Sequence, residues 1–481
     1  MAADSQPTPS KTRNRITRVI LFGVVLVGIV IVASVVSFAV WRWRLRKEIN
    51  FRIAAIHAAG LPVNWEELAK WPSQVPDSEN AALIYTNAIA HLHADGVSDD
   101  YRFELPPRGE APPDEMRSAV SGAVRTNRVA LEIAYTAAEL RRSRYPVEYL
   151  EGLNAKLPHL AGLKQLVKLL SCEAVLKADA GDAHGAAKAI ETSLHAAQSL
   201  DNEPILISQL VSASLLTLSC QSLERILCRS PLDDETLGKI GQHLISAEAT
   251  NRFVMGLIGE RALDGEFIRL AQDDVKRMIT IANQGSSDEE KAELPSRNPG
   301  IGWRFLGIFE RDRNFFLRGM ETNILIVAAK PPASLFLTNE TDKLETQARN
   351  GFYICSSLFL PSGSRIAVRD ASTRASLNTA ISAVAVERWR LAHHGAIPDS
   401  LKDLVPSFLP AVPIDPFDGQ PLRFKKLPTG YVIYSIGADR QDDGGKEKPP
   451  RSVQIPRDQR NRFDITFTVE RQQNILIWPQ H

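Results

Sequence analysis

Hydrophobic and polar positions change their pattern twice along this chain. Val19–Val40 contains no charged residue. From about Asp114 to Arg229, apolar residues recur every three or four positions, which predicts a succession of helices. After Gly395, short β-prone runs alternate with Asp-Pro and Asp-Gly turns, which predicts strands. The pattern therefore predicts a mainly α fold with a small C-terminal α+β unit, in which one long helix precedes a short antiparallel sheet.

The apolar run predicts one N-terminal transmembrane helix. A helix rises about 1.5 Å per residue, so Val19–Val40 matches the roughly 30 Å hydrocarbon core of a bilayer. Trp41 and Trp43 alternate with arginines just after it, as interfacial anchoring residues do. A cleavable signal peptide is the alternative, because Ser37 and Ala39 have the spacing of a cleavage site. Its apolar region usually spans only about 7–15 residues, so we predict an uncleaved single-pass signal anchor.

The rest of the chain divides by composition. The spacing of Ile49, Ile53 and Ile56 predicts that the membrane helix continues as a rigid stalk. Proline-punctuated segments then lead into a helical region and, after it, the C-terminal unit. The predicted parts are, in order, a disordered cytoplasmic tail (1–18), a transmembrane helix (19–41), a stalk and connecting segment (42–110), a helical domain (111–340) and a C-terminal α+β unit (371–481).

Two helices inside the predicted helical domain resemble a tetratricopeptide-type hairpin. Apolar residues repeat at helical spacing over Leu163–Ala178 and again over Ala186–Leu200, and a short Gly-Asp turn joins the two stretches. No 34-residue repeat flanks them, so we predict an irregular helical domain. Leu206–Leu227 predicts a third apolar helix, whose polar residues favour a place in the core over a second membrane span. The last long helix is predicted from about Ala371 to His393.

Composition narrows the function classes. The chain carries 57 basic and 56 acidic residues, which gives no electrostatic support for nucleic-acid binding. Its four cysteines are far apart and form no C-x-x-C pair, so neither a disulfide scaffold nor a thiolate zinc site is predicted. GxSxG, HExxH, GxxxxGKS/T and GxGxxG are all missing from the sequence. We therefore predict no enzymatic activity.

The segment SIGADRQDDGG, directly after the strand-like GYVIY, carries the most suggestive chemistry in the chain. Asp439, Asp442 and Asp443 crowd one loop that ends in paired glycines. Calcium prefers six to eight oxygen ligands, which clustered carboxylates and exposed carbonyls supply. A solvated turn, partly neutralised by Lys446 and Lys448, explains the same residues, and the spacing differs from that of an EF-hand. A catalytic carboxylate pair is the third interpretation, although nothing nearby in the sequence indicates a substrate cleft.

The C-terminal region resembles the C-terminal domain of the major pseudopilin of type II secretion systems. The shared features are AVERWRLAHHGAIPDSLKDLVPSFLPAVPIDPFDGQPLRF followed by GYVIYSIGADRQDDGG. In those pseudopilins the acidic loop binds calcium, so the resemblance implies Asp439, Asp442 and Asp443 as metal ligands and Ca²⁺ as the cofactor. Asp464 in FDIT matches the acidic residue before the final segment. The wider layout resembles large membrane-anchored proteins of planctomycetes and verrucomicrobia, from which no activity is carried over.

Two departures from the pseudopilin pattern matter. The membrane run has no prepilin cleavage site, and a large helical region separates it from the pilin-like helix. Assembly into a pseudopilus is therefore not expected. We predict a scaffold or interaction protein of the inner (plasma) membrane, with its bulk outside the cytoplasm, where calcium is plentiful, and with an unidentified protein partner. The alternative is a membrane-tethered hydrolase whose active site is assembled from distant residues.

Overall fold

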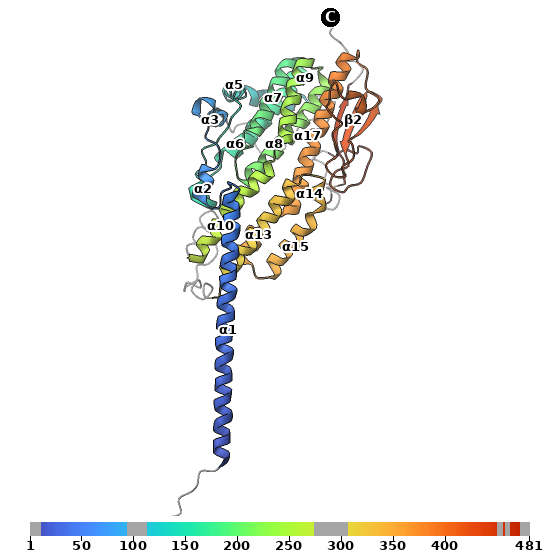
Figure 1. Ribbon diagram of the computed structural model, residues 1–481. Coiled ribbons are helices and arrows are strands. Elements are labelled where there is room, and N and C mark those ends of the chain that lie inside the picture. The colour runs from blue at the N-terminus through green and yellow to red at the C-terminus, as the bar shows by residue number, and fades with distance from the viewer. Residues whose placement is uncertain (1–10, 94–112, 274–305, 450–455, 457–461, 472–481) are drawn as a thin grey trace, which may run out of the picture.

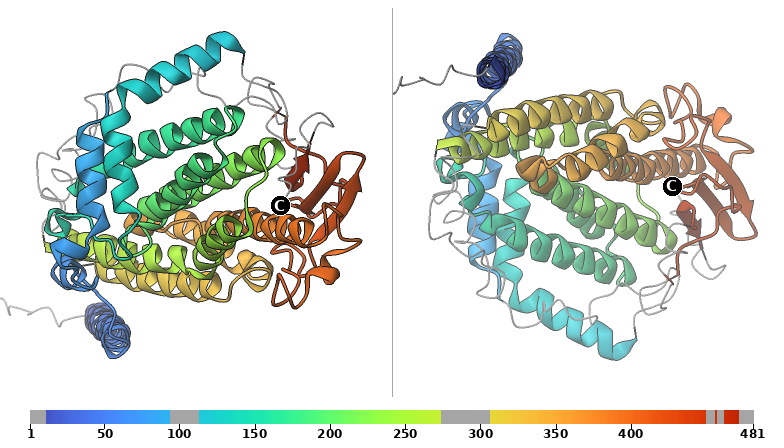
Figure 2. Two further views of the ribbon diagram at one scale, coloured as in Figure 1. Left: turned by 90° about the horizontal axis from the view of Figure 1, so that it is seen from above. Right: turned by 90° about the horizontal axis from the view of Figure 1, so that it is seen from below.

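The computed structural model describes residues 11–93, 113–273, 306–449, 456 and 462–471. The described chain is mainly helical and ends in a three-stranded antiparallel sheet, as predicted. One long helix, α1, projects from a body of packed helices, and the sheet lies on the side of that body away from α1 (Figures 1 and 2).

Helix α1 runs without interruption from Lys11 to Ala58. Its side chains between Val19 and Val40 are exposed, and it is long and apolar enough to cross a membrane. The same helix continues beyond the apolar run, as its spacing predicted, and ends just before Gly60, which adopts a φ of 69°. The helix begins inside the segment predicted to be disordered, since no proline or glycine interrupts it there. Residues 1–10 lie outside the described residues.

The stalk is fastened to the body through α13 (Ile308–Ala328). Arg42 donates through Nε to Glu310 at 3.0 Å, and Arg46 reaches the same oxygen at 3.3 Å. Arg52, ten residues after Arg42 on α1, pairs with Glu321 on α13. Burial works to raise the pKa of Glu310, but the hydrogen bond from Arg42 holds it below its usual range. Two ion-pair levels on two rigid helices fix how α1 is oriented on the body.

The connecting segment leads into short helices on one side of the body. They are α2 (Trp65–Lys70), α3 (Ala81–Ala90), α4 (Asp114–Thr126) and α5 (Arg128–Ala137). Apolar residues at helical spacing predict a helix here from about Ser78. Helix α3 begins three residues later, because the Asn80 side chain accepts the Ala82 N–H at 3.2 Å and caps it. Most of the proline-rich linker predicted between α3 and α4 lies outside the described residues.

Four longer helices form the centre of the body: α6 (Pro158–Asp179), α7 (Ala183–Gln198), α8 (Leu206–Arg229) and α9 (Asp234–Ala249). The turn between α6 and α7 contains Gly181 at a φ of 83° and Asp182, which accepts the Gly185 N–H and caps α7. Helix α8 is apolar enough to pass for a membrane span by composition, yet it is largely buried among its neighbours. It is therefore a core helix, as predicted.

The chain continues through α10 (Arg252–Asp273), α13, α14 (Ala333–Phe336), α15 (Thr338–Asn350) and α16 (Ile354–Phe359) to α17 (Gly363–Ala392). Helix α17 begins eight residues before the predicted start at Ala371, because Ile366 and Ala367 already pack into the core. The segment between 340 and 371, which the predicted parts left unassigned, is thus mostly helical.

The sheet has the strand order β1 (Arg423–Leu427), β2 (Gly430–Ser435), β3 (Ile465–Glu470), with antiparallel neighbours. The β-prone runs after Gly395 are PLRFKK, GYVIYSI, RFDITFTV and NILIW. The first three contain β1, β2 and β3, so the strands predicted there are confirmed, and NILIW lies outside the described residues. Helix α17 packs against β2 and β3 and also against α8 and α9. One hydrophobic core therefore joins the central helices to the sheet, and the boundary predicted at 371 does not separate two cores.

Two glycines inside helices test this packing. Glycine weakens a helix interior by about 1 kcal/mol relative to alanine, so Gly238→Ala in α9, where a methyl group meets nothing within 4 Å, should stabilise the protein by up to about that amount. At Gly259 in α10, the same methyl group would lie 1.6 Å from the Pro204 carbonyl oxygen. Gly259→Ala should therefore destabilise by about 1–3 kcal/mol. Thermal unfolding of both variants is the measurement. Equal changes in melting temperature for Gly238→Ala and Gly259→Ala would contradict the packing described here.

Candidate functional site

The acidic loop leaves β2 and folds back over the outer face of the sheet. Gly444 and Gly445 have φ values of 74° and 81°, a region that side chains other than glycine disfavour. A methyl group on Gly445 would lie 3.3 Å from the Tyr434 ring and 3.5 Å from Val432. The paired glycines thus let the backbone lie flat on β2, whose residues are all buried.

The three predicted ligands do not converge in the structure. Asp439 accepts the Gln441 N–H at 3.2 Å, and Asp442 accepts the Gly444 N–H at 3.0 Å, each within its own local turn. Asp443 is exposed. Among the residues that the structure describes, no three His, Cys, Asp or Glu side chains are grouped to hold a metal ion.

Asp464 is the carboxylate that fastens the loop. It lies just before β3, only 4% exposed, and its Oδ2 accepts the Gly445 N–H at 2.7 Å and the Lys446 N–H at 3.2 Å. Burial raises the pKa of Asp464, and the nearby charge of Asp442 acts in the same direction. Its second oxygen, Oδ1, is buried and has no hydrogen-bond partner. Among the described residues of the loop and its surroundings, this oxygen is therefore a buried carboxylate atom with unused bonding capacity.

The sequence analysis missed the most heavily bonded carboxylate of the unit, Asp415, which is fully buried in the PIDPFDG turn. Its oxygens accept four hydrogen bonds, at 2.7–2.9 Å, from the Phe417 N–H, the Ser435 hydroxyl, the Ile436 N–H and the Arg423 guanidinium. Asp415 thereby ties the turn to the end of β2 and the start of β1. An aspartate between apolar residues and a proline, eight positions before an arginine, was the available signal.

Arg423 supplies positive charge to this end of the sheet. It pairs with Asp415 and Asp418, and its Nε lies 3.7 Å from the Asp442 carboxylate. Burial acts to raise the pKa of Asp418, but the hydrogen bonds from Arg423 hold that pKa below its usual range. Part of the negative charge that suggested a metal ion is therefore balanced by a side chain of the protein itself.

A second buried network joins the inner face of the sheet to the helices. Glu387 of α17 accepts hydrogen bonds from the Tyr431 hydroxyl at 2.9 Å, from Arg471 at 2.6 Å and from Arg390 at 3.3 Å. Arg471 also donates to the Leu227 carbonyl at the end of α8. Burial raises the pKa of Tyr431 well above its usual value, which keeps it a neutral donor. These side chains are buried, and their contacts hold the sheet in place.

The closest approach to hydrolase chemistry in the described residues lies between α6 and α8. The His159 ring is 3.0 Å from Glu203, and the Ser208 hydroxyl donates to that same glutamate. The serine thus contacts the acid and not the imidazole, which is the reverse of a nucleophile activated by its base. All three side chains are buried, and Tyr145 stacks on His159 with ring centroids 4.2 Å apart. The group is a buried hydrogen-bond network that positions the α7–α8 connection.

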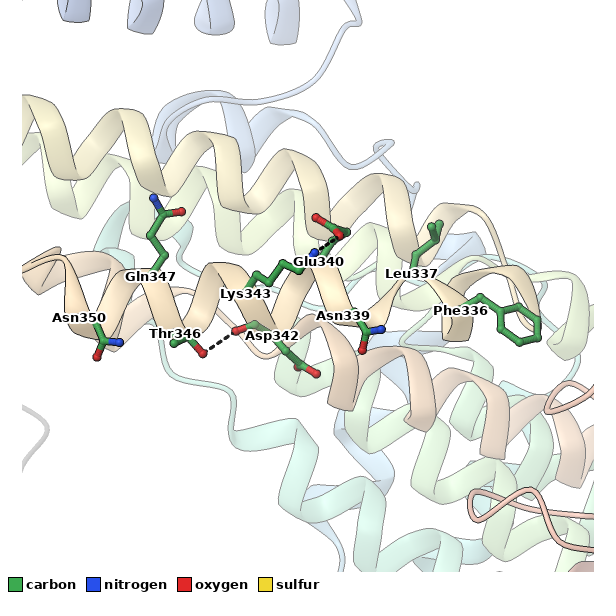
Figure 3. Close-up of a pocket in the computed structure, with 9 residues that line it drawn as sticks. All are labelled: Phe336, Leu337, Asn339, Glu340, Asp342, Lys343, Thr346, Gln347 and Asn350. Atoms are coloured by element: carbon green, nitrogen blue, oxygen red, sulfur yellow. Dashed lines mark hydrogen bonds and ion pairs between the residues drawn. The ribbon is translucent and has the colours of Figure 1, made fainter.

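The surface carries an open hollow of about 680 Å³ along α14 and α15 (Figure 3). The polar side chains there bond within the helix, as Lys343 does with Glu340 at 2.7 Å and Thr346 with the Asp342 carbonyl at 2.9 Å. They do not converge on a point where a reacting atom could sit. The hollow combines apolar and polar side chains, as protein contact surfaces do. Its lining residues are Phe336, Leu337, Asn339, Glu340, Asp342, Lys343, Thr346, Gln347 and Asn350.

No protein-family model, curated protein or solved structure matches this chain.

The role of Asp415 can be measured against a matched aspartate of the same unit. Asp415→Ala removes the acceptor of four buried donors and should lower the free energy of unfolding by about 3–5 kcal/mol. Asp439→Ala removes one local contact at the surface and should change it by no more than about 0.5 kcal/mol. Denaturant unfolding of both variants is the measurement. Comparable losses in the two would show that Asp415 does not hold the unit together.

Proposed function

We propose that this protein is a single-pass, membrane-anchored scaffold or interaction protein of the inner (plasma) membrane, with its body outside the cytoplasm. One observation carries the proposal: the exposed apolar half of α1 continues, in one helix, into a stalk that is ion-paired to the body. Exposing so many apolar side chains to water is unfavourable, and a bilayer removes that cost. The attached stalk would hold the body at a fixed orientation above the membrane.

A partner has two candidate surfaces in this proposal. The α6–α7 hairpin is proposed to be of tetratricopeptide type and to present its outer face. The hollow along α14 and α15 offers the second surface, because Phe336 and Leu337 are exposed there among amide side chains, a mixture that suits a protein interface. Within the described residues we find no nucleophile–base pair opening to a cleft, so the hydrolase alternative is not developed further.

The pseudopilin resemblance leads to a calcium proposal for the acidic loop. The unused, buried Oδ1 of Asp464 beside Asp442 supports it, because an ion could take up that oxygen. Asp439, Asp442 and Asp443 are the further carboxylates within the loop. Since these side chains are not grouped as a set of three, backbone carbonyls and water would have to complete the six to eight oxygens that calcium needs. Such a site would be weak, in the roughly 10⁻⁴–10⁻³ M range of extracellular modules.

Thermal unfolding in millimolar calcium tests this proposal. At ten times the dissociation constant, an ion adds about 1.4 kcal/mol to stability, which amounts to a shift of a few degrees. Asp442→Asn combined with Asp443→Asn should abolish the calcium-dependent part, and magnesium, which demands a stricter octahedral geometry, should not reproduce it. An unchanged wild-type transition in calcium would mean that the loop is only a turn.

Membrane anchoring and orientation need separate measurements. We expect the full-length chain to stay in the membrane fraction during alkaline carbonate extraction, because Val19–Val40 holds it by hydrophobic contact with lipid. A phosphatase active only outside the cytoplasm, fused to the C-terminus, should be active. Release of the intact chain by carbonate would contradict the anchor. An anchored but inactive fusion would instead reverse the orientation and leave the anchor in place.

A further inference from the structure

Exposed apolar side chains gather at the end of the body from which α1 emerges. They belong to the turn between α15 and α16 and to α16 itself, a segment here called the basal turn and defined as residues 351–358. Phe352 is 85% exposed, Leu358 74% and Ile354 40%. Soluble proteins seldom expose large apolar residues in such a concentrated group without a partner for them. The question is what covers the basal turn.

The basal turn is held against the first turns of α13. Arg311 donates to the Gly351 carbonyl at 2.9 Å, and its guanidinium lies 4.3 Å from the centre of the Tyr353 ring. That ring stacks on Phe315, with centroids 4.1 Å apart. The polar and aromatic partners of the turn therefore face the body, while Phe352 is directed away from it.

The backbone of the turn is fixed as well. Asp312 accepts the N–H groups of Cys355 and Ser356 at 2.7 and 3.0 Å and so fastens the start of α16. Phe352 has a φ of 55°, a left-handed conformation that a bulky residue seldom adopts. Because the neighbouring residues are anchored, the outward position of Phe352 is a built feature of the fold.

The same end of α13 meets α1 where its apolar run stops. Gly307 lies so close to the Trp41 ring that a methyl group on it would be 3.1 Å away, and Glu310 pairs with Arg42. Trp41 directly follows the uncharged segment that ends at Val40. The basal turn and the end of the apolar run are thus both tied to the first turns of α13. In Figure 1 the turn between α15 and α16 lies at the lower end of the body, on the side toward which the apolar part of α1 extends.

We propose that the basal turn inserts Phe352 and Leu358 into the interface of the same membrane that α1 spans, giving the body a second, monotopic lipid contact. The inference rests on the proposed membrane anchor. Interfacial segments bury their apolar side chains about 5–10 Å into the boundary between headgroups and acyl chains, next to the level that tryptophan side chains occupy. Arg349, which precedes the turn at the end of α15, is exposed and suits anionic headgroups.

The contact can be measured in the full-length protein reconstituted into vesicles of phosphatidylcholine and phosphatidylglycerol. The native Cys172, Cys220, Cys228 and Cys355 are all buried, so an introduced surface cysteine can be labelled selectively with an environment-sensitive fluorophore. The test positions are Phe352→Cys and Leu358→Cys. The matched control is Leu325→Cys, which is 65% exposed on α13 but lies roughly 20 Å further along that helix from Glu310. Val30→Cys in the apolar run reports on the anchor.

Lipids carrying a nitroxide near the top of the acyl chain should quench the labels at 352 and 358 several-fold more than the label at 325. Quenching at 30 without quenching at 352 and 358 would overturn the basal contact and leave the anchor standing. A blue-shifted label at 352 that lipid nitroxides do not quench would show a protein surface or a second copy there, and would also overturn it. Absence of quenching at 30 would contradict the membrane anchor itself. Thermal unfolding matched to wild type confirms that each labelled variant is folded.

Discussion

The ion pairs that Glu310 makes with Arg42 and Arg46 set the orientation of helix α1 relative to the helical body. Glu310 is largely buried at the start of α13, where a carboxylate is costly unless it is paired. Its partners are on α1, just beyond the apolar run. Removal of either side leaves buried charge uncompensated, so the contact is specific. Arg52 and Glu321 form a second ion pair, so α1 is joined to α13 at two points along its length.

Helix α13, which carries Glu310, connects to the basal turn on one side and to the packed helices of the body on the other. Toward the membrane, α13 positions the basal turn through Arg311 and Asp312. Away from it, the helices pack in sequence to α17, which belongs both to the helical core and to the support of the sheet. Glu387 then holds Tyr431 within β2, and Asp415 holds the end of β2 to the turn before β1. The acidic loop is fastened to this framework through Asp464, and Gly445 lets it lie against β2.

The sequence predicted those elements whose signals are local. The uncharged run, the helical spacing around the Gly-Asp turn and the alternation in GYVIY are each contained within a few residues, and each gave the right element. Boundaries were less accurate, because a cap such as Asn80 competes with equally good capping residues just before it. The start of α17 also differed, since Ile366 and Ala367 are helical because of what they pack against.

The hydrogen-bond and ion-pair partners of the acidic residues at the candidate site could not be predicted from local sequence patterns. Asp439, Asp442 and Asp443 are conspicuous because they are close in sequence, whereas Asp439 and Asp442 accept hydrogen bonds within their own turns and Asp442 also forms an ion pair with Arg423. Asp415 and Glu387 find partners up to 84 positions away, and no periodicity reports such contacts. The basal turn escaped notice for a related reason: a single Phe in a short loop is unremarkable until its level relative to Trp41 is known.

The most direct test of the account is the distance between spin labels at Phe51→Cys on α1 and Leu325→Cys on α13 in the reconstituted full-length protein. Both side chains are exposed, so the labels should not disturb packing. A rigid stalk predicts one narrow distance distribution, which should broaden when Glu310→Gln and Glu321→Gln remove both ion-pair levels. A broad distribution in the otherwise unaltered protein would show that α1 moves freely on the body, and would contradict the account.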